Sequence, residues 1–251
     1  MADFYDELAP FYHLIFEDWS ASIALQGGQL SQIIQTEWSG SSRVLDVSCG
    51  IGTQSIGLAA QGYSVSGSDL SAAAIDRARN EAAARQMQIS FSVADIREAS
   101  PHHGDGFDVV ISADNSVPHL LGDEQILQAF SQMHACLRPG GGCLITVRDY
   151  NIEPRGRDIL KPIGVRVSGG KRYLLFQVWD FAGECYDLKL FIIEEDLQTG
   201  HVLSRVFQSK YYAISTDKLM DLLTAAGFRN VRRLDGRFCQ PVLIGTKRNA
   251  Q

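Results

Sequence analysis

Short apolar runs rich in β-branched residues alternate with amphipathic stretches between residues 43 and 147. These runs predict strands at 43–47, 64–68, 89–93, 107–112 and 142–147. The stretches between them predict helices at 53–61, 71–86 and 123–137. Strands that alternate with helices in this way form a parallel sheet with helices on both faces. The pattern therefore predicts a Rossmann-like α/β fold.

The segments on either side of this core follow other patterns. Upstream, two helices are expected over 3–19 and 22–38, and the first is unusually aromatic. Downstream, between about 164 and 212, longer runs predict an antiparallel β insertion with strands at 172–180, 186–194 and 205–213. A last helix at 216–226 and two strands at 228–234 and 242–247 close the chain, with the two strands paired antiparallel at the sheet edge.

The charge balance narrows the choice of partners. Lys and Arg number 23 against 29 Asp and Glu, for a net charge of -6, and no dense basic run occurs. We therefore expect no nucleic-acid or anionic-membrane partner. No apolar stretch approaches the roughly 20 residues that span a bilayer. Residues 1–10 also lack the basic and apolar regions of a secretory signal, which indicates a cytoplasmic protein.

The cysteines give no sign of a metal site or a disulfide framework. There are 5 of them, an odd number, widely spaced and without a C-x-x-C pair. We expect them to be reduced and mostly buried, and we expect no bound metal.

Candidate chemistry lies just after each predicted strand, because ligands of open α/β sheets bind outside the carboxyl ends of the strands. The first strand runs through Asp46 into a tight turn that holds Ser48, Gly50 and Gly52. Glycines there let the backbone approach a ligand closely, and the following helix offers unpaired N–H groups at its start.

Two further carboxylates follow the second and third strands. Asp69, with Leu70 beside it, is placed to accept both hydroxyls of a ribose. Asp95 is placed to accept from an adenine amino group while Ile96 packs on the ring. Each aspartate alone is better explained as a helix cap or a turn residue. Together, in this order, they describe a site for an adenosine-containing ligand.

A nicotinamide cofactor would also use an acidic ribose ligand, but the full G-x-G-x-x-G is missing. Ser48 takes the first glycine position if the motif starts there, and Ser55 takes the third if it starts at Gly50. The residues instead resemble the class I S-adenosylmethionine-dependent methyltransferases, whose L-D-x-G-C-G-x-G motif is matched from Leu45 to Gly52 except at Ser48. The resemblance implies S-adenosylmethionine as cofactor and S-adenosylhomocysteine as product. It also implies that Asp114, after strand four, belongs to the cofactor site.

The resemblance further implies a seven-stranded sheet in a single domain over 1–251. Residues 1–38 would form a helical lid and 39–150 the cofactor-binding core. Residues 151–214 would form the β-rich insertion, and 215–251 the C-terminal helix and edge hairpin.

The segments 112–121 and 148–150, after strands four and five, resemble the glycine and glycine/sarcosine N-methyltransferases. In that family an Asn matching Asn115 holds the acceptor amine, and an Arg matching Arg148 pairs with its carboxylate. Arg presents a planar fork suited to this role. His119 or Tyr211 would relay a proton. One departure is Phe191, which stands near the place where the family brings a tyrosine to the substrate.

The sequence thus predicts methyl transfer from S-adenosylmethionine to a small molecule, with the amine of glycine, sarcosine or a similar amino acid as the first choice. O- or C-methylation by the same fold, a non-catalytic adenosine-ligand sensor and a nicotinamide-dependent oxidoreductase stay open as alternatives. The family resemblance also suggests a homo-oligomer.

Overall fold

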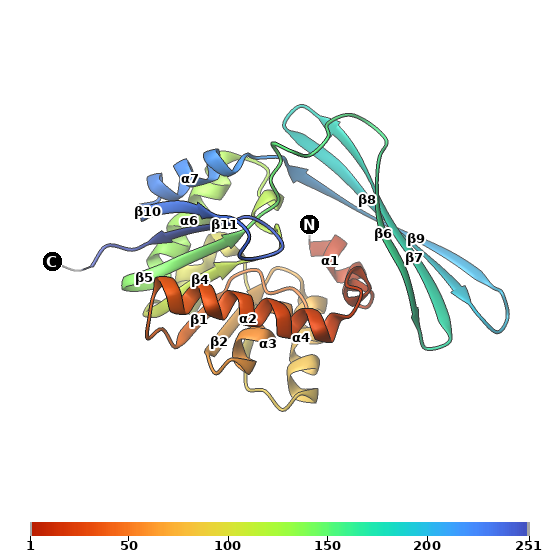
Figure 1. Ribbon diagram of the computed structural model, residues 1–251, viewed down its shortest axis with the longest axis horizontal. Coiled ribbons are helices and arrows are strands. Elements are labelled where there is room, and N and C mark those ends of the chain that lie inside the picture. Colours follow the sequence, from red (N-terminus) through yellow and green to blue (C-terminus); the bar gives the residue numbers. More distant parts are fainter. Residues whose placement is uncertain (1, 250–251) are drawn as a thin grey trace.

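The structure, a computed structural model, describes residues 2–249 (Figure 1). Its centre is a seven-stranded sheet in the order β10-β11-β5-β4-β1-β2-β3. The parallel part comprises β1 (Arg43–Asp46), β2 (Ser64–Asp69), β3 (Ser90–Val93), β4 (Phe107–Ser112) and β5 (Leu137–Thr146). Strands β10 (Arg229–Leu234) and β11 (Val242–Thr246) pair antiparallel, with β10 at the edge. The predicted α/β sheet and its closing hairpin are confirmed.

Alternating side chains of these strands face two helical layers. Val44 packs in a cluster with Ile34 of helix α2 (Trp19–Glu37) and with Leu58 of helix α3 (Thr53–Ala60). The next residue, Leu45, packs instead with Phe130 of helix α6 (Asp123–Cys136), on the same side as helix α7 (Thr216–Ala225). The period of two along each strand thus produces a core on both faces.

Helices α2 and α3 cross at very short range because both carry glycine at the crossing. A Cβ on Gly27 would lie 2.4 Å from the carbonyl carbon of Gly57. A larger residue at either position would push the two helices apart. The remaining helices of the core are α4 (Ala72–Ala84), which Ser71 caps through the Ala74 amide, and the short α5 (Ala99–His103).

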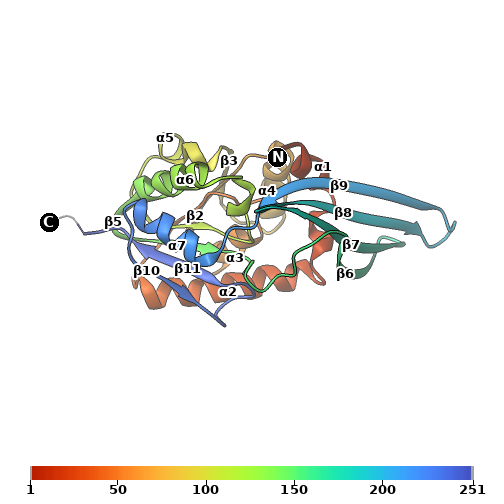
Figure 2. The same ribbon diagram turned by 90° about the horizontal axis from the view of Figure 1, so that it is seen from above.

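The N-terminal segment is not the continuous helix expected over 3–19. Helix α1 (Ala2–Leu8) ends before Pro10, a 3₁₀ turn η1 (Tyr12–Ile15) follows, and α2 begins at Trp19 with Asp18 as its N-cap. Pro10 lacks the amide hydrogen that a helix through this point would need. The result is a compact segment between the central sheet and the second sheet (Figures 1 and 2).

The second sheet is antiparallel and has one strand more than the sequence pattern predicted. Its order is β6-β7-β8-β9, formed by β6 (Ile159–Ser168), β7 (Lys171–Ala182), β8 (Cys185–Asp196) and β9 (Val202–Tyr212). Strand β6 was missed because Pro162 and Gly164 interrupt its alternation. The register shifts between these residues, so the strand continues past the irregularity.

Smaller differences concern the ends of elements. Helix α6 ends at Cys136, and Leu137 already pairs with Phe107 of β4 before the strand resumes at Gly142. The 3₁₀ turns η2 (Ile96–Glu98) and η3 (Val117–His119) follow β3 and β4.

The cysteines are all free, and Cys49, Cys136 and Cys143 are buried as expected, whereas Cys239 is exposed. Within residues 2–249, no helix has both the length and the apolar character required to cross a membrane. The same residues contain no group of three or more His, Cys, Asp or Glu side chains placed to hold a metal ion.

Candidate functional site

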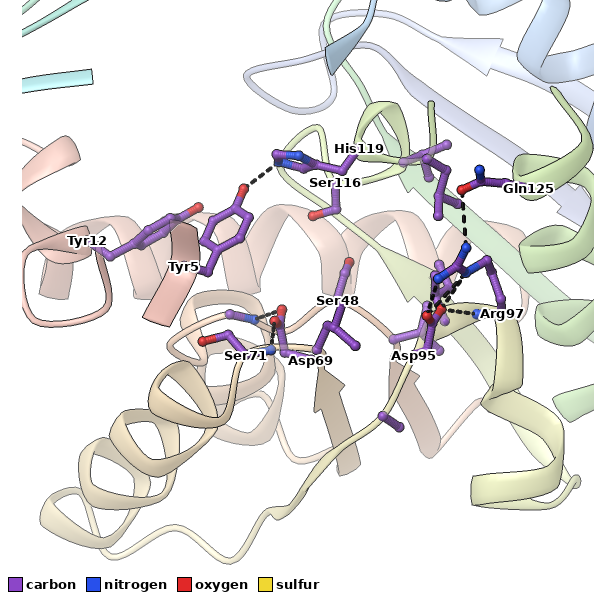
Figure 3. A pocket seen from close by; sticks show the side chains of 17 residues that line it. Tyr5, Tyr12, Ser48, Asp69, Ser71, Asp95, Arg97, Ser116, His119 and Gln125 are labelled. Carbon is purple, nitrogen blue, oxygen red and sulfur yellow. Dashed lines mark hydrogen bonds and ion pairs between the residues drawn. The ribbon is translucent and has the colours of Figure 1, made fainter. Parts of the chain in front are cut away.

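A pocket opens at the carboxyl ends of β1, β2 and β3, under the N-terminal segment (Figure 3). It encloses a cavity of about 110 Å³. The predicted residues that line it are Ser48, Gly50, Asp69, Leu70, Asp95, Ile96 and His119. Sites for drug-sized ligands usually measure ~300 Å³ or more. An adenosine ligand would therefore enter only with some movement of the covering segment.

The turn after β1 is shaped by Gly50 and Asp69. Gly50 has a φ of +52°, and a Cβ built on it would meet nothing within 4 Å. A side chain here would project into open space, and the positive φ would be strained for it. One Asp69 oxygen accepts the Gly50 amide at 2.9 Å and the other accepts the Ser71 amide at 3.0 Å. Burial raises the pKa of Asp69.

Asp46 and Gly52 lie behind the pocket wall rather than on it. Asp46 is fully buried and accepts hydrogen bonds from the Ser55 hydroxyl at 2.8 Å and the Ser48 amide at 3.3 Å. Burial raises the pKa of Asp46 to about 7. Gly52 has a φ of +93° and is the N-cap residue of α3, where a Cβ would contact Ile56 at 3.1 Å. Both residues hold the loop in shape.

Asp95 already has a partner, Arg97, that the sequence pattern did not indicate. The Arg97 guanidinium bonds both of its oxygens, and one of these contacts is 2.5 Å long. Arg97 also donates to Gln125 at 3.2 Å, which links the end of β3 to helix α6 (Figure 3). The guanidinium keeps the pKa of Asp95 below its usual value. The Arg97 amide also donates to Asp95 Oδ1 at 2.8 Å, so Arg97 fills about all four acceptor positions of the carboxylate, and a ligand amine would have to displace one of these contacts.

The N-terminal segment supplies two tyrosines that cover the pocket. The Tyr5 hydroxyl lies 2.7 Å from His119 Nε2, and the Tyr12 hydroxyl donates to Asp114 at 3.4 Å. Asp114 itself lies outside the pocket lining and has a φ of +57°. The aromatic pattern of residues 4–19 could have indicated that this segment covers the pocket. Which rings face the pocket depends on the break in the helix at Pro10.

Beyond Asp114, the buried side chain of Asn115 is fixed on both sides. Its Oδ1 accepts the Arg148 amide at 3.0 Å, and its Nδ2 donates to the Tyr150 hydroxyl at 2.8 Å. Asn115 has a φ of +63°, a conformation that asparagine adopts more readily than most residues. One lone pair and one amide hydrogen of Asn115 have no partner among residues 2–249, but the side chain is only 4% exposed and does not line the pocket.

The Arg148 guanidinium sits in an aromatic setting. Its Cζ lies 4.7 Å from the centre of the Trp179 ring, and its Nη1 donates to the Tyr186 hydroxyl at 3.4 Å. Its anionic partner is Glu153, at 3.6 Å, which also pairs with Lys161 at 2.5 Å.

Two other carboxylates, those of Asp149 and Asp114, are engaged elsewhere. Asp149 pairs with Arg233 at 2.7 Å, and Asp114 accepts from Tyr12 and from Gln240 at 3.4 Å each. The pairing of Arg148 with Glu153 across the start of the β insertion had no visible signal in the sequence.

The insertion does bring a tyrosine to the cluster around Arg148. This tyrosine is Tyr186, whereas the sequence placed Phe191 near that position. Tyr186 of β8 lies 3.1 Å from the Tyr150 hydroxyl and stacks on Tyr211 at 5.2 Å. Phe191 alternates to the opposite face of the sheet, where it stacks on Phe176. A tyrosine hydroxyl therefore lies beside Arg148, and the alternation of side chains along β8 is the signal that could have located it.

His119 lines the pocket and contacts Tyr5 and Tyr211. Its ring lies 4.0 Å from that of Tyr211, and its Nδ1 lies 3.3 Å from the Ser209 hydroxyl. Burial lowers the pKa of His119 to about 3. The imidazole is therefore neutral at physiological pH and can pass a proton on only transiently.

The central sheet and the carboxylates at its edge define a class of protein. Residues 44–141 match the family described as "Methyltransferase domain". The fold, this match and the pocket place this part of the chain in the class I S-adenosylmethionine-dependent methyltransferases. The residues present fit that cofactor, because Gly50 leaves open space beside the Asp69 carboxylate and Leu70 and Ile96 provide apolar walls.

Relatives with known names share this region. The glycine N-methyltransferase of Rattus norvegicus is 37% identical over 123 residues, which are 45% of this chain and 42% of that protein. The match thus spans less than half the length of this relative. Among solved structures, DesVI of Streptomyces venezuelae has a TM-score of 0.80 at 19% identity, covering 90% of this chain and 92% of that one.

A further structure shares the fold and was determined with S-adenosylmethionine bound. CalS10, an amino pentose methyltransferase from Micromonospora echinaspora, has a TM-score of 0.78 at 18% identity and covers 90% of this chain and 92% of that chain. These findings support S-adenosylmethionine as the cofactor of the pocket.

Proposed function

We propose that this protein transfers a methyl group from S-adenosylmethionine to the amine of a small molecule, with glycine, sarcosine or a similar amino acid as the first candidate acceptor. The observation that carries the proposal is the arrangement of Asn115 and Arg148. They lie side by side after β4 and β5, at the same sheet edge as Asp69, and are linked by a hydrogen bond of 3.0 Å.

When bound, S-adenosylmethionine would supply a sulfonium methyl that is already activated, so the protein's task is mainly to position the acceptor. The free Asn115 Oδ1 lone pair would accept an amine hydrogen and so orient the nitrogen lone pair. Arg148 would hold a carboxylate through its fork of N–H groups. Tyr5 and Tyr12 would cover the pocket and exclude water.

No charged general base is required in this arrangement. Neutral His119 contacts Tyr5 on one side and Ser209 on the other, so it can accept a hydrogen bond but does not hold a stable positive charge. The amine would bind in its unprotonated form and lose its proton to solvent after transfer. Tyr211 would orient His119 through ring contact.

A second candidate acceptor is an amine without a carboxylate, such as an amino sugar. The observation that favours it is Glu153, because a carboxylate already lies 3.6 Å from Arg148. CalS10, which shares this fold, is an amino pentose methyltransferase. O- or C-methylation of another small molecule remains an alternative that this pocket geometry does not specifically favour.

A panel of acceptors tests the proposal. S-adenosylhomocysteine formation would be followed with glycine, sarcosine, longer amino acids, amino sugars and matched hydroxy compounds. We expect turnover with an amine and none with the corresponding alcohol. Turnover restricted to hydroxyl or carbon acceptors would reject amine transfer, and absence of turnover despite cofactor binding would favour a sensor.

A further inference from the structure

One residue of the pocket departs from the motif of the methyltransferase class, and it carries a hydroxyl. The motif from Leu45 to Gly52 has serine at position 48, where the class has glycine. The Ser48 side chain lines the pocket. In Figure 3 its hydroxyl points into the space between Asp69 and Ser116. A glycine at this place would offer a ligand no side-chain polar atom.

Ser48 is paired with a second serine, at the end of the neighbouring strand β4. The hydroxyl oxygens of Ser48 and Ser112 lie 2.8 Å apart. Ser112 is the last residue of β4 and is fully buried, and among residues 2–249 its hydroxyl has no other hydrogen-bond partner. A buried hydroxyl hydrogen without an acceptor is costly, so Ser112 donates its hydrogen to Ser48.

This direction leaves the Ser48 hydroxyl as a donor toward the pocket. A serine hydroxyl has one hydrogen and two lone pairs. Ser112 fills one lone pair of Ser48, and the Ser48 hydrogen then has no acceptor within residues 2–249. A hydroxyl that accepts a hydrogen bond is polarised and becomes a better donor itself. The pair therefore presents one oriented O–H group to a ligand in the pocket.

The order of the strands indicates which part of the cofactor reaches this hydroxyl. The sheet runs β4-β1-β2-β3 in this region, with neighbouring strands ~4.8 Å apart. The adenine expected at Asp95 would lie at the end of β3, and the ribose expected at Asp69 at the end of β2. The rest of the cofactor, with its sulfonium and its amino acid portion, would then extend to the ends of β1 and β4, where Ser48 and Ser112 lie.

One group in that part of the cofactor accepts hydrogen bonds. The sulfonium and the ammonium are cations, whereas the carboxylate has about four acceptor positions. A hydroxyl that donates to a carboxylate forms a charge-assisted bond, which is stronger than a bond between neutral groups. We propose that the Ser112–Ser48 pair recognises the carboxylate of the cofactor and makes the site selective for ligands that carry this group. This inference rests on the cofactor of the proposed function and not on its acceptor.

The same contact would hold the product of the reaction. S-adenosylhomocysteine keeps the carboxylate after the methyl group has left, so methyl transfer does not weaken the bond from Ser48. A contact that is equally strong before and after transfer adds affinity without favouring the chemical step. Serine at this position therefore strengthens inhibition by the product, compared with the glycine of the class.

The test compares two ligands that differ only in the carboxylate. Calorimetry without an acceptor would measure the Kd of S-adenosylhomocysteine and that of S-adenosyl-3-thiopropylamine, its decarboxylated form. Ser48→Ala should raise the Kd of S-adenosylhomocysteine about tenfold, because a bond to a charged group is lost. Ser112→Ala, which removes the donor that orients Ser48, should raise it about threefold. Both variants should bind the decarboxylated form as the wild type does.

The matched control is Ser64→Ala. Ser64 is exposed at the first position of β2, at the opposite end of the strand from the pocket, so this variant should bind both ligands normally. Circular dichroism should show all variants folded. Equal weakening of both ligands in Ser48→Ala would mean that the pair only shapes the turn, and it would overturn the proposal. So would an unchanged Kd for S-adenosylhomocysteine in that variant.

These outcomes can be told apart from failure of the proposed function. A wild type that binds neither ligand would reject the cofactor, and this inference with it. A protein that transfers methyl groups only to hydroxyl or carbon acceptors would reject amine transfer but would leave the predicted Kd values as they are.

Discussion

Asp69 and Asp95 end neighbouring strands, yet their surroundings suit them to different tasks. Asp69 accepts hydrogen bonds from backbone amides, and within residues 2–249 it forms no salt bridge, so it lines the pocket without a cation at contact distance. Asp95 is held in a salt bridge by Arg97. We therefore expect Asp69 to contribute more to cofactor affinity.

The Asp69→Asn variant tests this expectation. Loss of the charge weakens hydrogen bonds to ribose hydroxyls, and bonds to charged groups contribute about 1.5–3 kcal/mol each. The Kd for S-adenosylmethionine, measured by calorimetry, should rise by about tenfold or more. Asp76→Asn, on the exposed surface of α4, is the control and should bind normally. An unchanged Kd in Asp69→Asn would exclude the ribose role.

Asp46 should make stability depend on pH. Its pKa is about 7 in the folded protein, because burial disfavours its charge, and about 4 when unfolded. The folded state then binds more protons between these values, so the contribution of Asp46 to stability is full below pH 4 and lost as pH rises through 7. From pH 4 to 8 the wild type should lose about 1–4 kcal/mol relative to Asp46→Asn.

Chemical denaturation of both proteins across that range measures the difference. Taking the difference between the two cancels the contributions of His103 and the other titrating groups. Parallel pH curves would mean that Asp46 has a similar pKa in both states.

His119 should leave no mark on the pH profile of the reaction. Burial lowers its pKa to about 3, whereas the acceptor must lose a proton to become nucleophilic. The rate should therefore rise with pH according to the pKa of the amine, with the same profile in wild type and His119→Asn. A limb near pH 6–7 that vanishes in the variant would identify His119 as a general base.

Glu153 should compete with a carboxylate-bearing acceptor for Arg148. Glu153→Gln removes a charge 3.6 Å from the guanidinium, and Lys161 loses the same partner. The KM for an amino acid acceptor should fall about fivefold, equivalent to ~1 kcal/mol, while the KM for an amino sugar should not change.

Glu195→Gln, which loses the pair with Arg172 on the second sheet, is the matched control. Its KM values should equal those of the wild type. A fall in KM for both acceptor types in Glu153→Gln would show that Glu153 does not compete for the carboxylate.

At the scale of elements, the N-terminal segment is held by the second sheet. Arg166 of β6 donates to the Phe16 carbonyl at 2.7 Å and to the Ile15 carbonyl at 3.4 Å, at the end of η1. Arg205 of β9 lies over the Phe11 ring at 4.8 Å. The segment that covers the pocket is thus held by the insertion on one side. On the other side the core holds it, where Asp6 accepts from the Ser71 hydroxyl at 2.6 Å and Arg77 donates to the Ala9 carbonyl at 2.7 Å.

Arg166→Ala should loosen this cover. We expect cofactor release, measured by stopped-flow fluorescence, to become several-fold faster, since two hydrogen bonds to the segment are lost. The control Arg232→Ala removes an exposed pair with Glu37 on the far side of the core and should release the cofactor at the wild-type rate. Equal rates in all three proteins would mean that the segment does not control release.

Most elements could be predicted from periodicity, and the failures have local causes. The core strands alternate cleanly and carry the motif, so their positions and the Asp69 and Gly50 sites followed from the sequence. The prediction of one continuous helix over 3–19 is wrong at Pro10. Proline lacks the amide hydrogen that a helix needs there, and this outweighs the aromatic pattern. Strand β6 was not predicted, because the irregularity at Pro162 interrupts the alternation of side chains that marks a strand.

At the scale of the whole molecule, the acceptor side depends on contacts that local patterns do not encode. Tyr186 meets Tyr150 and Arg148 only because the second sheet folds back over the edge of the first. Glu153 reaches Arg148 from the connection between the sheets. Such pairings require the register of β7 to β9 and the placement of the insertion, whereas the cofactor side needs only strand ends of one sheet.

Isotopic labelling shows whether the protein transfers a methyl group at this shared edge. The purified protein would be incubated with S-adenosylmethionine labelled in the transferred methyl group and with the panel of small amines. We predict that label appears in one amine at the rate at which S-adenosylhomocysteine accumulates. Cofactor binding without label transfer to any acceptor, or calorimetric binding of NAD but not of S-adenosylmethionine, would contradict the account.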